Sequence, residues 1–158
     1  MKLLTVINLL LTGLFTVSAQ AALYDRGNGI IYDDVLEITW LQDANYAQTS
    51  GYDADGLMDW NQANAWAAQL EYGGYNDWRL PSANLDNEDN PCCNIGYNNT
   101  TSEMGHMFYT NLGNIGLLDS DGNPQADYGV TNNSFTDGNS GNTMSILNIQ
   151  EEHYWFED

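Results

Sequence analysis

Residues 58–81 read MDWNQANAWAAQLEYGGYNDWRLP. Asp59 can cap a helix, and the apolar residues that follow recur at spacings of three and four, which is typical of a helix with one buried face. Gly73-Gly74 can adopt the left-handed geometry that ends a helix. Pro81 disfavours helical geometry at Leu80, so YNDWRL should be a short strand or an extended connection. This stretch therefore predicts a helix, a glycine stop and an extended segment. The apolar positions are Trp60, Ala63, Trp66, Ala67 and Leu70.

The flanking sequence predicts short strands, a second helix and much loop. Residues 30–32 and 36–41 read as two strands of a hairpin that follows a turn over 25–29. Ser102 is a cap position, and apolar residues at helical spacing continue to 112, before Gly113. Beyond residue 115, short apolar runs alternate with Asn, Gly and Asp turns. The predicted class is α+β, with two helices, short antiparallel strands and long irregular loops.

The charge of the chain restricts its partners. It has 158 residues, 22 of them acidic and three basic, for a net charge of −19. The length allows one small domain. Such a negative surface repels phosphate backbones, sulfated polysaccharides and anionic lipid headgroups. We therefore expect no nucleic-acid partner, whereas divalent cations and neutral, hydroxyl-rich ligands are compatible with the charge.

Residues 1–21 are predicted to be a secretory signal peptide. Lys2 supplies one positive charge, an apolar stretch follows over 3–17, and Ala19-Gln20-Ala21 supplies the small residues of a cleavage site. The apolar stretch is short for a membrane span of about 20 residues, and no later stretch is longer. We expect 22–158 to be one secreted domain, extracellular or periplasmic, with no membrane span in the mature chain. Without Lys2 its net charge would be −20.

The two cysteines, Cys92 and Cys93, are adjacent and follow Pro91. Neighbouring Cα atoms are only about 3.8 Å apart, closer than ordinary disulfide geometry, so a bridge between them would form a strained ring. In an oxidising compartment three interpretations are open: this vicinal bridge, which we favour, two bonds to a second chain, or two thiols with no special role. Zinc is disfavoured because its sites use separated cysteines or nearby His, and the nearest histidine is His106.

Six short motifs follow one another along the chain and resemble a known family. They are GIIYD (29–33), TW (39–40), MDWNQA (58–63), GGYNDWRLP (73–81), SEM (102–104) and YW (154–155). In this order they resemble the Lcl C-terminal domain family, a former domain of unknown function named from a bacterial collagen-like adhesin. GGYNDWRLP is the most specific of them. The resemblance implies a C-type lectin-like fold over nearly the whole predicted domain.

The sequence departs from this family in two respects. Family members continue past a pair like Tyr154-Trp155 with further strands, whereas this sequence stops at Asp158. We therefore expect a domain without its C-terminal strands, one that completes its fold differently, or one that leaves an edge strand open to another chain. Adhesin members that bind sulfated glycosaminoglycans need basic surface. Two arginines beyond the leader do not provide it, so that ligand is not expected.

Four side chains of the family motifs are predicted to be structural. They are Trp60, Trp78, Arg79 and Trp155. Arg79 is a lone arginine amid carboxylates such as Asp77 and Glu103, and arginine suits bidentate pairing with a carboxylate. We expect an internal ion pair for Arg79, and a place in the core rather than a sugar platform for the tryptophans.

The pattern Asp-Xaa-Asp-Gly occurs at 53–56 and 119–122. Alternate oxygen-bearing side chains on a tight turn can converge on a hard cation. The second copy is therefore a candidate calcium site, and calcium is the only cofactor that the sequence suggests. Neither copy completes an EF-hand, and a plain turn is the competing interpretation because Asp and Gly are turn residues. The candidate ligands are Asp119, Asp121, Asn123 and Asp127.

No set of side chains in the sequence identifies a catalytic centre. Carboxylates are so numerous that some pair is always available, and His106 and His153 read as a partly buried helix residue and a surface residue. We expect a non-enzymatic binding or surface-interaction domain, whose partner is a neutral polysaccharide, the extracellular matrix or another surface protein. The alternatives are an extracellular glycan hydrolase that uses an acidic pair and a structural matrix component that associates by edge-strand pairing at its carboxyl end.

Overall fold

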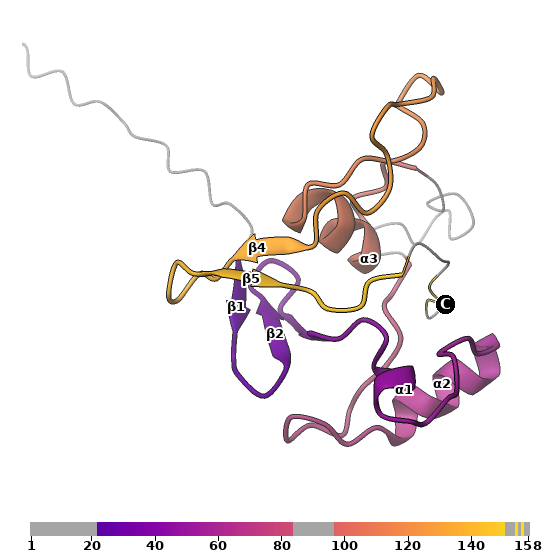
Figure 1. Cartoon of the computed structure of the whole chain (residues 1–158), viewed down its shortest axis with the longest axis vertical. Helices are drawn as coiled ribbons and strands as arrows, with labels where there is room; N and C mark the ends of the chain where they lie inside the picture. The colour runs from indigo at the N-terminus through magenta and orange to yellow at the C-terminus, as the bar shows by residue number, and fades with distance from the viewer. Residues whose placement is uncertain (1–21, 84–96, 151–153, 155, 157–158) are drawn as a thin grey trace, which may run out of the picture.

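The computed structural model describes residues 22–83, 97–150, 154 and 156. The predicted signal peptide, Cys92-Cys93, His153 and Trp155 lie outside these residues. The described part of the chain is a small mixed α/β domain with two small antiparallel sheets and few helices (Figure 1). Its elements are β1 (Leu23–Asp25), β2 (Ile30–Asp33), β3 (Ile38–Leu41), α1 (Tyr46–Thr49), α2 (Trp60–Gln69), α3 (Glu103–Gly105), the π-helical η1 (His106–Asn111), β4 (Ser134–Thr136) and β5 (Thr143–Ser145).

The first sheet is an antiparallel meander in the order β1-β2-β3. Ile31 lies opposite Trp40, and Leu23 lies opposite Asp33. The predicted hairpin over β2 and β3 is confirmed, and β1 adds a third strand that was not predicted. The turn between β1 and β2 has three successive residues with positive φ, Gly27, Asn28 and Gly29, which explains its glycine-rich sequence.

The second sheet is the hairpin β4-β5, in which Phe135 lies opposite Met144. It is attached to the first sheet at β1, where the Gly138 N–H donates to the Leu23 carbonyl over 2.9 Å. The chain after β5 lies alongside the chain after β3 in parallel orientation, with Leu147 paired to Asp43, and the Leu147 N–H donates to the Gln42 carbonyl over 2.7 Å. These contacts join the two ends of the described chain into one body.

Two hydrophobic clusters make up the core. The larger one consists of Leu23, Ile31, Met107, Leu112, Phe135 and Ile146, and the smaller one of Ala63, Ala67 and Leu80. Strands of both sheets and η1 contribute to the larger cluster, whereas α2 contributes its two buried alanines to the smaller one and packs the partly buried Trp66 against it. Of the three tryptophans predicted for the core, the two that the structure describes do not lie in these clusters. Trp60 is 39% exposed because it stands at the first turn of α2, beyond the edge of the cluster. Trp78 is half-buried, in edge contact with Tyr75 at a ring-centroid distance of 6.3 Å.

Helix α2 begins as the sequence predicts and ends earlier. The Asp59 carboxylate accepts the Gln62 N–H over 2.9 Å, and the Gln62 side chain accepts the Asp59 N–H, which makes a capping box. The predicted stop at Gly73-Gly74 is wrong, because Leu70 already has extended geometry with ψ of 124°. The two glycines, with φ of +61° and +90°, instead form the turn of a tight hairpin between Tyr72 and Tyr75.

The predicted second helix is confirmed, although most of it is wider than an α-helix. The Ser102 hydroxyl accepts the Gly105 N–H over 3.0 Å and caps α3. From His106 the chain continues as η1, where the Leu112 N–H donates to the Met107 carbonyl, five residues back. Gly113, at φ of +68°, ends the helix as predicted.

Residues 115–129 form a projecting arm (Figure 1). Its base is closed by pairing of Ile115 with Gly129, and its outer part by pairing of Leu118 with Pro124. The second Asp-Xaa-Asp-Gly sequence, 119–122, turns the chain between these outer residues. The predicted calcium loop is therefore the outer end of a hairpin-like arm.

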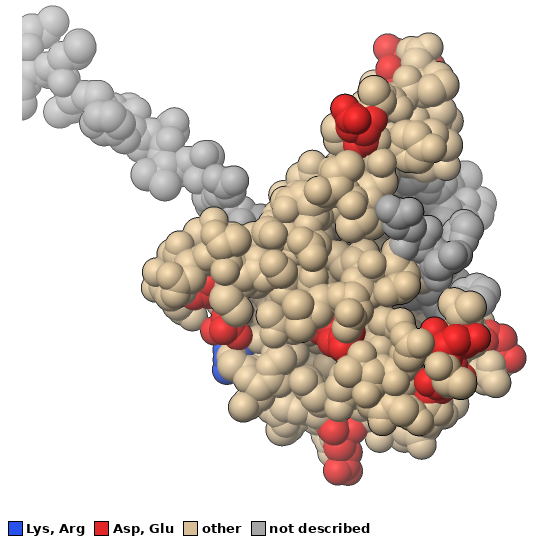
Figure 2. All heavy atoms as spheres, viewed as in Figure 1, with Lys and Arg blue, Asp and Glu red and all other residues tan. Residues whose placement is uncertain are grey.

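Acidic side chains are spread over the face shown in Figure 2, and most of that face is neither acidic nor basic. The charge of the chain is thus not gathered into one acidic patch on this face. Among the helices of the described residues, none has the length and apolar character needed to cross a membrane.

Two buried carboxylates connect, by hydrogen bonds, segments that are distant in sequence. Asp33, fully buried at the end of β2, accepts the backbone N–H groups of Val35 and Leu36 over 3.0 and 3.1 Å. Its other oxygen accepts the Asn111 amide over 2.7 Å, which connects the first sheet with η1. Asp137, 3% exposed, accepts the Asp25 N–H over 2.9 Å and connects the second sheet with β1.

Asp137 should make the free energy of unfolding fall at acidic pH. Hydrogen bonds from the hydroxyl and N–H of Ser140 and from the Asp25 N–H lower the pKa of Asp137 from 3.8 to about 2. Because the pKa of Asp137 is lower in the folded state than in the unfolded state, its ionised form stabilises the fold at pH values above the unfolded-state pKa of about 4. This stabilisation is lost as the pH falls towards 2. In urea unfolding at pH 7, the free energy of unfolding of the wild type should be larger than that of Asp137→Asn. This difference should shrink as the pH falls from 4 to 2. An equal difference at pH 7 and pH 2 would contradict this role.

Candidate functional site

A bidentate ion pair joins the WRLP segment to helix α3. The Arg79 guanidinium donates to the two carboxylate oxygens of Glu103 over 2.8 and 2.6 Å. The Ser82 N–H donates to the same carboxylate over 2.7 Å, and the Glu103 N–H donates back to the Ser82 carbonyl. The Glu103 side chain is only 4% exposed, whereas that of Arg79 is 45% exposed. The predicted internal ion pair of Arg79 is thus found with Glu103.

Replacing Glu103 with Gln should destabilise the domain by about 2 kcal/mol, since a buried charged acceptor is lost and an amide donor faces other donors. Asp77→Asn is the matched control, because Asp77 is an exposed acid of the same motif, and such surface changes cost roughly 0.5 kcal/mol or less. Chemical denaturation of the three proteins measures the difference. Equal midpoints for wild type and Glu103→Gln would show that the pair does not stabilise the fold.

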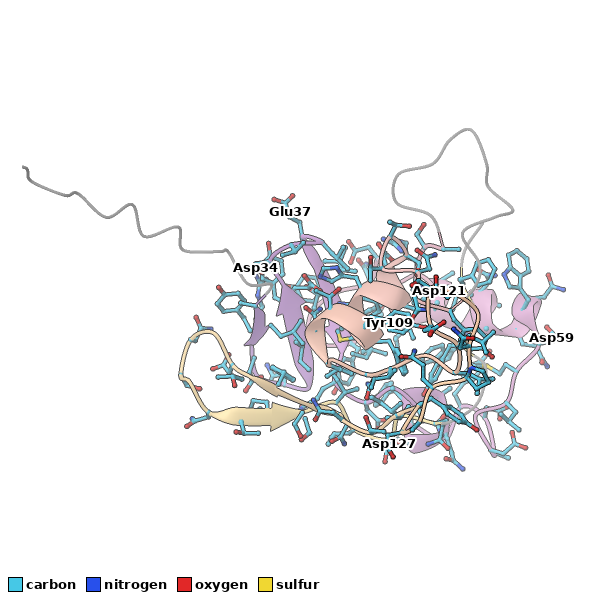
Figure 3. All side chains as sticks on the ribbon, turned by 90° about the horizontal axis from the view of Figure 1, so that it is seen from above. Asp34, Glu37, Asp59, Tyr109, Asp121 and Asp127 are labelled. Atoms are coloured by element: carbon cyan, nitrogen blue, oxygen red, sulfur yellow. The ribbon has the colours of Figure 1, made fainter. Side chains whose placement is uncertain are left out.

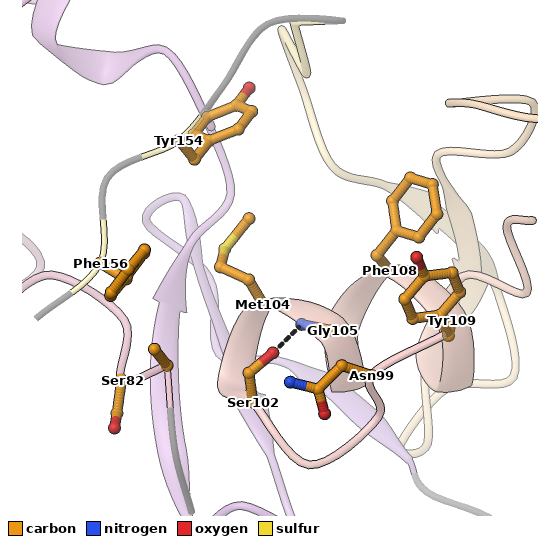
Figure 4. Close-up of a pocket in the computed structure, with 10 residues that line it drawn as sticks. Ser82, Asn99, Ser102, Met104, Gly105, Phe108, Tyr109, Tyr154 and Phe156 are labelled. Carbon is orange, nitrogen blue, oxygen red and sulfur yellow. Dashed lines mark hydrogen bonds between the residues drawn. The ribbon is translucent and has the colours of Figure 1, made fainter. Parts of the chain in front are cut away.

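The ion pair lies beside a hollow of about 310 Å³, which we call the aromatic hollow (Figure 4). In Figure 4, Tyr154 and Phe156 stand on one side, Phe108 and Tyr109 on the other, and Met104 between them. Polar side chains and small residues complete the lining. The described residues that line the aromatic hollow are Ser82, Ala83, Asn99, Ser102, Met104, Gly105, Phe108, Tyr109, Tyr154 and Phe156.

Hydrogen bonds outside the aromatic hollow hold its carboxyl-terminal wall. The indole N–H of Trp60 donates to the Phe156 carbonyl over 2.9 Å, which connects this wall with the start of α2. The Gln150 N–H donates to the Tyr154 hydroxyl over 2.7 Å. Burial raises the pKa of Tyr154 above 10, so its hydroxyl is uncharged at neutral pH. Trp60 was predicted to be structural, and it holds this wall through its indole N–H. It does so from an exposed position and not from the core.

The opposite wall comes from α3 and η1. Phe108 and Tyr109 are neighbours in η1, and their rings meet edge to face with centroids 4.8 Å apart. Gly105 has no room for a side chain, since a Cβ there would lie 2.7 Å from the Ser102 hydroxyl oxygen and still closer to the Asn99 carbonyl. The missing side chain of Gly105 therefore lets the Asn99 carbonyl lie close to α3, beside the Ser102 cap that is drawn as a dashed line in Figure 4.

The lining of the aromatic hollow combines ring faces with uncharged polar groups. None of its described residues is charged at neutral pH, although the chain carries 22 acidic residues. Hydroxyl and amide side chains, from Ser82, Ser102, Tyr109 and Asn99, stand among the aromatic ones. Pockets of roughly 300–1,000 Å³ with apolar walls and a few polar groups are typical of small-molecule sites. This lining can bind a neutral ligand that has both apolar faces and hydroxyl groups.

The candidate calcium ligands are arranged as a turn. The Asp119 carboxylate accepts the backbone N–H groups of Asp121 and Asn123 over 2.9 and 2.8 Å, and these bonds lower its pKa. Figure 3 shows Asp127 well apart from Asp121. The first copy of the pattern is built in the same way, with Asp53 accepting the N–H of Gly56 over 2.8 Å. In the described ranges, no three His, Cys, Asp or Glu side chains are grouped so that they could hold a metal ion.

Calcium binding at this turn stays a prediction, and thermal unfolding tests it. An ion that binds the folded state raises the melting temperature in proportion to the logarithm of its concentration. Millimolar calcium should raise the melting temperature of the wild type, and Asp121→Ala should remove the rise. Asp55→Ala, the equivalent change in the first copy, is the control and should keep it. If calcium leaves the melting temperature of the wild type unchanged, residues 119–122 are a turn without a calcium site.

Sequence reasoning missed the aromatic hollow. Phe108 and Tyr109 were interpreted only as helix residues, and Tyr154 only as part of a family motif. No local pattern brings Ser82, Ser102 and Tyr154 together, because they are separated by 20 and 52 residues. The aromatic content of the chain, 12%, is the available signal for such a site, but it does not indicate which aromatic residues meet.

The described residues form a small mixed α/β domain with a hollow whose lining is aromatic and uncharged. Comparisons with protein-family models, curated proteins and solved structures gave no match. The ligand is therefore inferred from the chemistry of the lining.

Proposed function

We propose that this chain is a secreted, non-enzymatic, lectin-like domain that binds a neutral polysaccharide in the aromatic hollow. The observation that carries the proposal is the uncharged lining, with Phe108 and Tyr109 on one side and Tyr154 and Phe156 on the other. The resemblance of the sequence motifs to the Lcl C-terminal domain family supports a C-type lectin-like domain, and the leader over 1–21 supports secretion.

Sugars suit this lining because a pyranose ring has an apolar face and a rim of hydroxyl groups. Aromatic side chains offer apolar area for the ring face, and the tyrosine hydroxyls add a polar group. The side chains of Asn99, Ser82 and Ser102 provide amide and hydroxyl groups at the same hollow. A neutral sugar is thus matched by both kinds of group in the lining.

The negative charge of the chain favours neutral over acidic polysaccharides as ligands. At a net charge of −19 the protein repels polyanions at long range, and the described lining of the aromatic hollow carries no cation to offset this. Arg79, which lies nearby, has its guanidinium engaged by the Glu103 carboxylate. A neutral chain approaches without this electrostatic cost.

A binding domain is favoured over a glycan hydrolase by the position of the carboxylates. Glycoside hydrolysis uses two carboxylic groups that flank the scissile bond. None of the described residues that line the aromatic hollow is Asp or Glu. Glu103, the acid next to it, has its carboxylate turned to Arg79 and to the Ser82 N–H.

Replacing Tyr109 with Ala should lower the affinity for a neutral polysaccharide by roughly tenfold or more, since burying an aromatic side chain contributes about 1.5–3 kcal/mol. Tyr52→Ala, which removes a 51% exposed tyrosine between α1 and α2, is the matched control and should bind as the wild type does. A glycan array followed by titration calorimetry measures both. Circular dichroism verifies that each variant is folded.

Two results would overturn the proposal. One is the absence of binding to any neutral polysaccharide at high protein concentration. The other is release of reducing ends from a polysaccharide that a single Asp or Glu substitution abolishes while binding persists, since this would make the protein a hydrolase.

A further inference from the structure

Tyr97 is an exposed aromatic residue beside the aromatic hollow. It precedes Asn99, which lines the hollow, by two residues, and its side chain is 52% exposed. A Cβ placed on Gly116 would lie 3.1 Å from the Tyr109 hydroxyl oxygen and 3.3 Å from Tyr97 Cβ. Tyr97 and the wall residue Tyr109 therefore meet at the same glycine, at the base of the arm.

The backbone at Tyr97 is held by the arm. The next residue, Asn98, has a left-handed φ of 64°, which an asparagine adopts at a cost. Its amide donates to the Leu118 carbonyl over 2.7 Å and thereby connects this segment with the arm. The Asn99 side chain accepts the Thr101 N–H over 2.9 Å, so the residue that follows is held too. The exposed ring of Tyr97 is thus presented from an anchored segment.

We propose that Tyr97 forms a second sugar subsite outside the aromatic hollow, so that the protein binds a stretch of several sugar units rather than a single sugar. This inference rests on the proposed function of the hollow. A hollow of about 310 Å³ accommodates only a short part of a chain. A chain that leaves the hollow past Tyr109 and Asn99 meets Tyr97, whose exposed ring offers apolar area for the face of the next sugar.

The groups around Tyr97 also favour a neutral ligand at this subsite. The groups that adjoin Tyr97 at Gly116 are the Tyr109 hydroxyl and the Asn98 side chain, both uncharged. On the arm, Asp119 directly follows Leu118, whose carbonyl accepts the Asn98 amide, and hydrogen bonds from Asn123 and Asp121 lower the pKa of its carboxylate, which is therefore ionised at neutral pH. An anionic polysaccharide would be repelled here, whereas a neutral one would not.

The test uses ladders of neutral gluco-oligosaccharides of one to six units, in β-1,3, β-1,4 and α-1,4 linkage, titrated into the full chain by calorimetry and NMR. Affinity should rise from one unit to about three or four units for the linkage that binds. Tyr97→Ala should lower the affinity for the longer oligosaccharides roughly tenfold, as expected for the loss of one aromatic contact, and leave the monosaccharide unchanged. Tyr97→Phe should keep the rise with length, because it keeps the ring, and Tyr52→Ala should behave as the wild type.

The possible failures are distinguishable. If mono- and oligosaccharides bind equally well and Tyr97→Ala changes neither, the second subsite is overturned and the hollow keeps its proposed function. If Tyr97→Ala weakens the monosaccharide as much as the hexasaccharide, Tyr97 belongs to the hollow and the separate subsite is again overturned. If no ladder binds and the glycan array is negative as well, the proposed function is overturned and the subsite with it.

Discussion

The ion pair between Arg79 and Glu103 is the interaction on which the arrangement of the candidate site depends. It joins the extended segment after α2 to Glu103, the first residue of α3, which Ser102 directly precedes in sequence. A carboxylate that is almost fully buried is stable only with such partners, since an unpaired buried charge is costly. Here a guanidinium and the Ser82 N–H satisfy it together. Without this pair, the two segments that line one side of the aromatic hollow would lose their common anchor.

Other buried polar groups supplement a core that is small. The larger hydrophobic cluster has six buried residues, drawn from strands of both sheets and from η1. Asp33 connects the first sheet with η1, and Asp137 connects it with the β4-β5 hairpin. Each carboxylate accepts backbone N–H groups of a turn as well as a more distant donor. In a chain with few basic residues, backbone and amide donors satisfy most of the carboxylates described above, and this explains how so acidic a sequence can bury some of them.

The parts of the fold that could be predicted are those encoded within a few residues. The capping box at Asp59, the cap at Ser102 and the stop at Gly113 depend on local side-chain and backbone chemistry, and all three are found. The stop at Gly73-Gly74 was wrong because two glycines suit a helix end and a tight hairpin equally well. Here they form the hairpin between Tyr72 and Tyr75, with Gly73 close to Ile30 of β2. The exposure of Trp60 was missed for a related reason. Helical spacing places it on the same face as Ala63 and Ala67, but does not reveal where the neighbouring cluster ends.

The sequence by itself determined the mixed α and β class of the domain, its net charge, the start of both predicted helices and the end of the second one, because these follow from composition and from contacts between near neighbours. The tertiary structure alone decided which aromatic side chains meet. Ser82, Tyr109 and Tyr154 come from three separate stretches, and long-range contacts such as the ion pair at Glu103 and the bond from Trp60 to Phe156 bring these stretches to one hollow. Long-range contacts of this kind leave no periodic pattern in the chain, since the residues that make them are spaced by the path of the fold and not by the geometry of a helix or a strand.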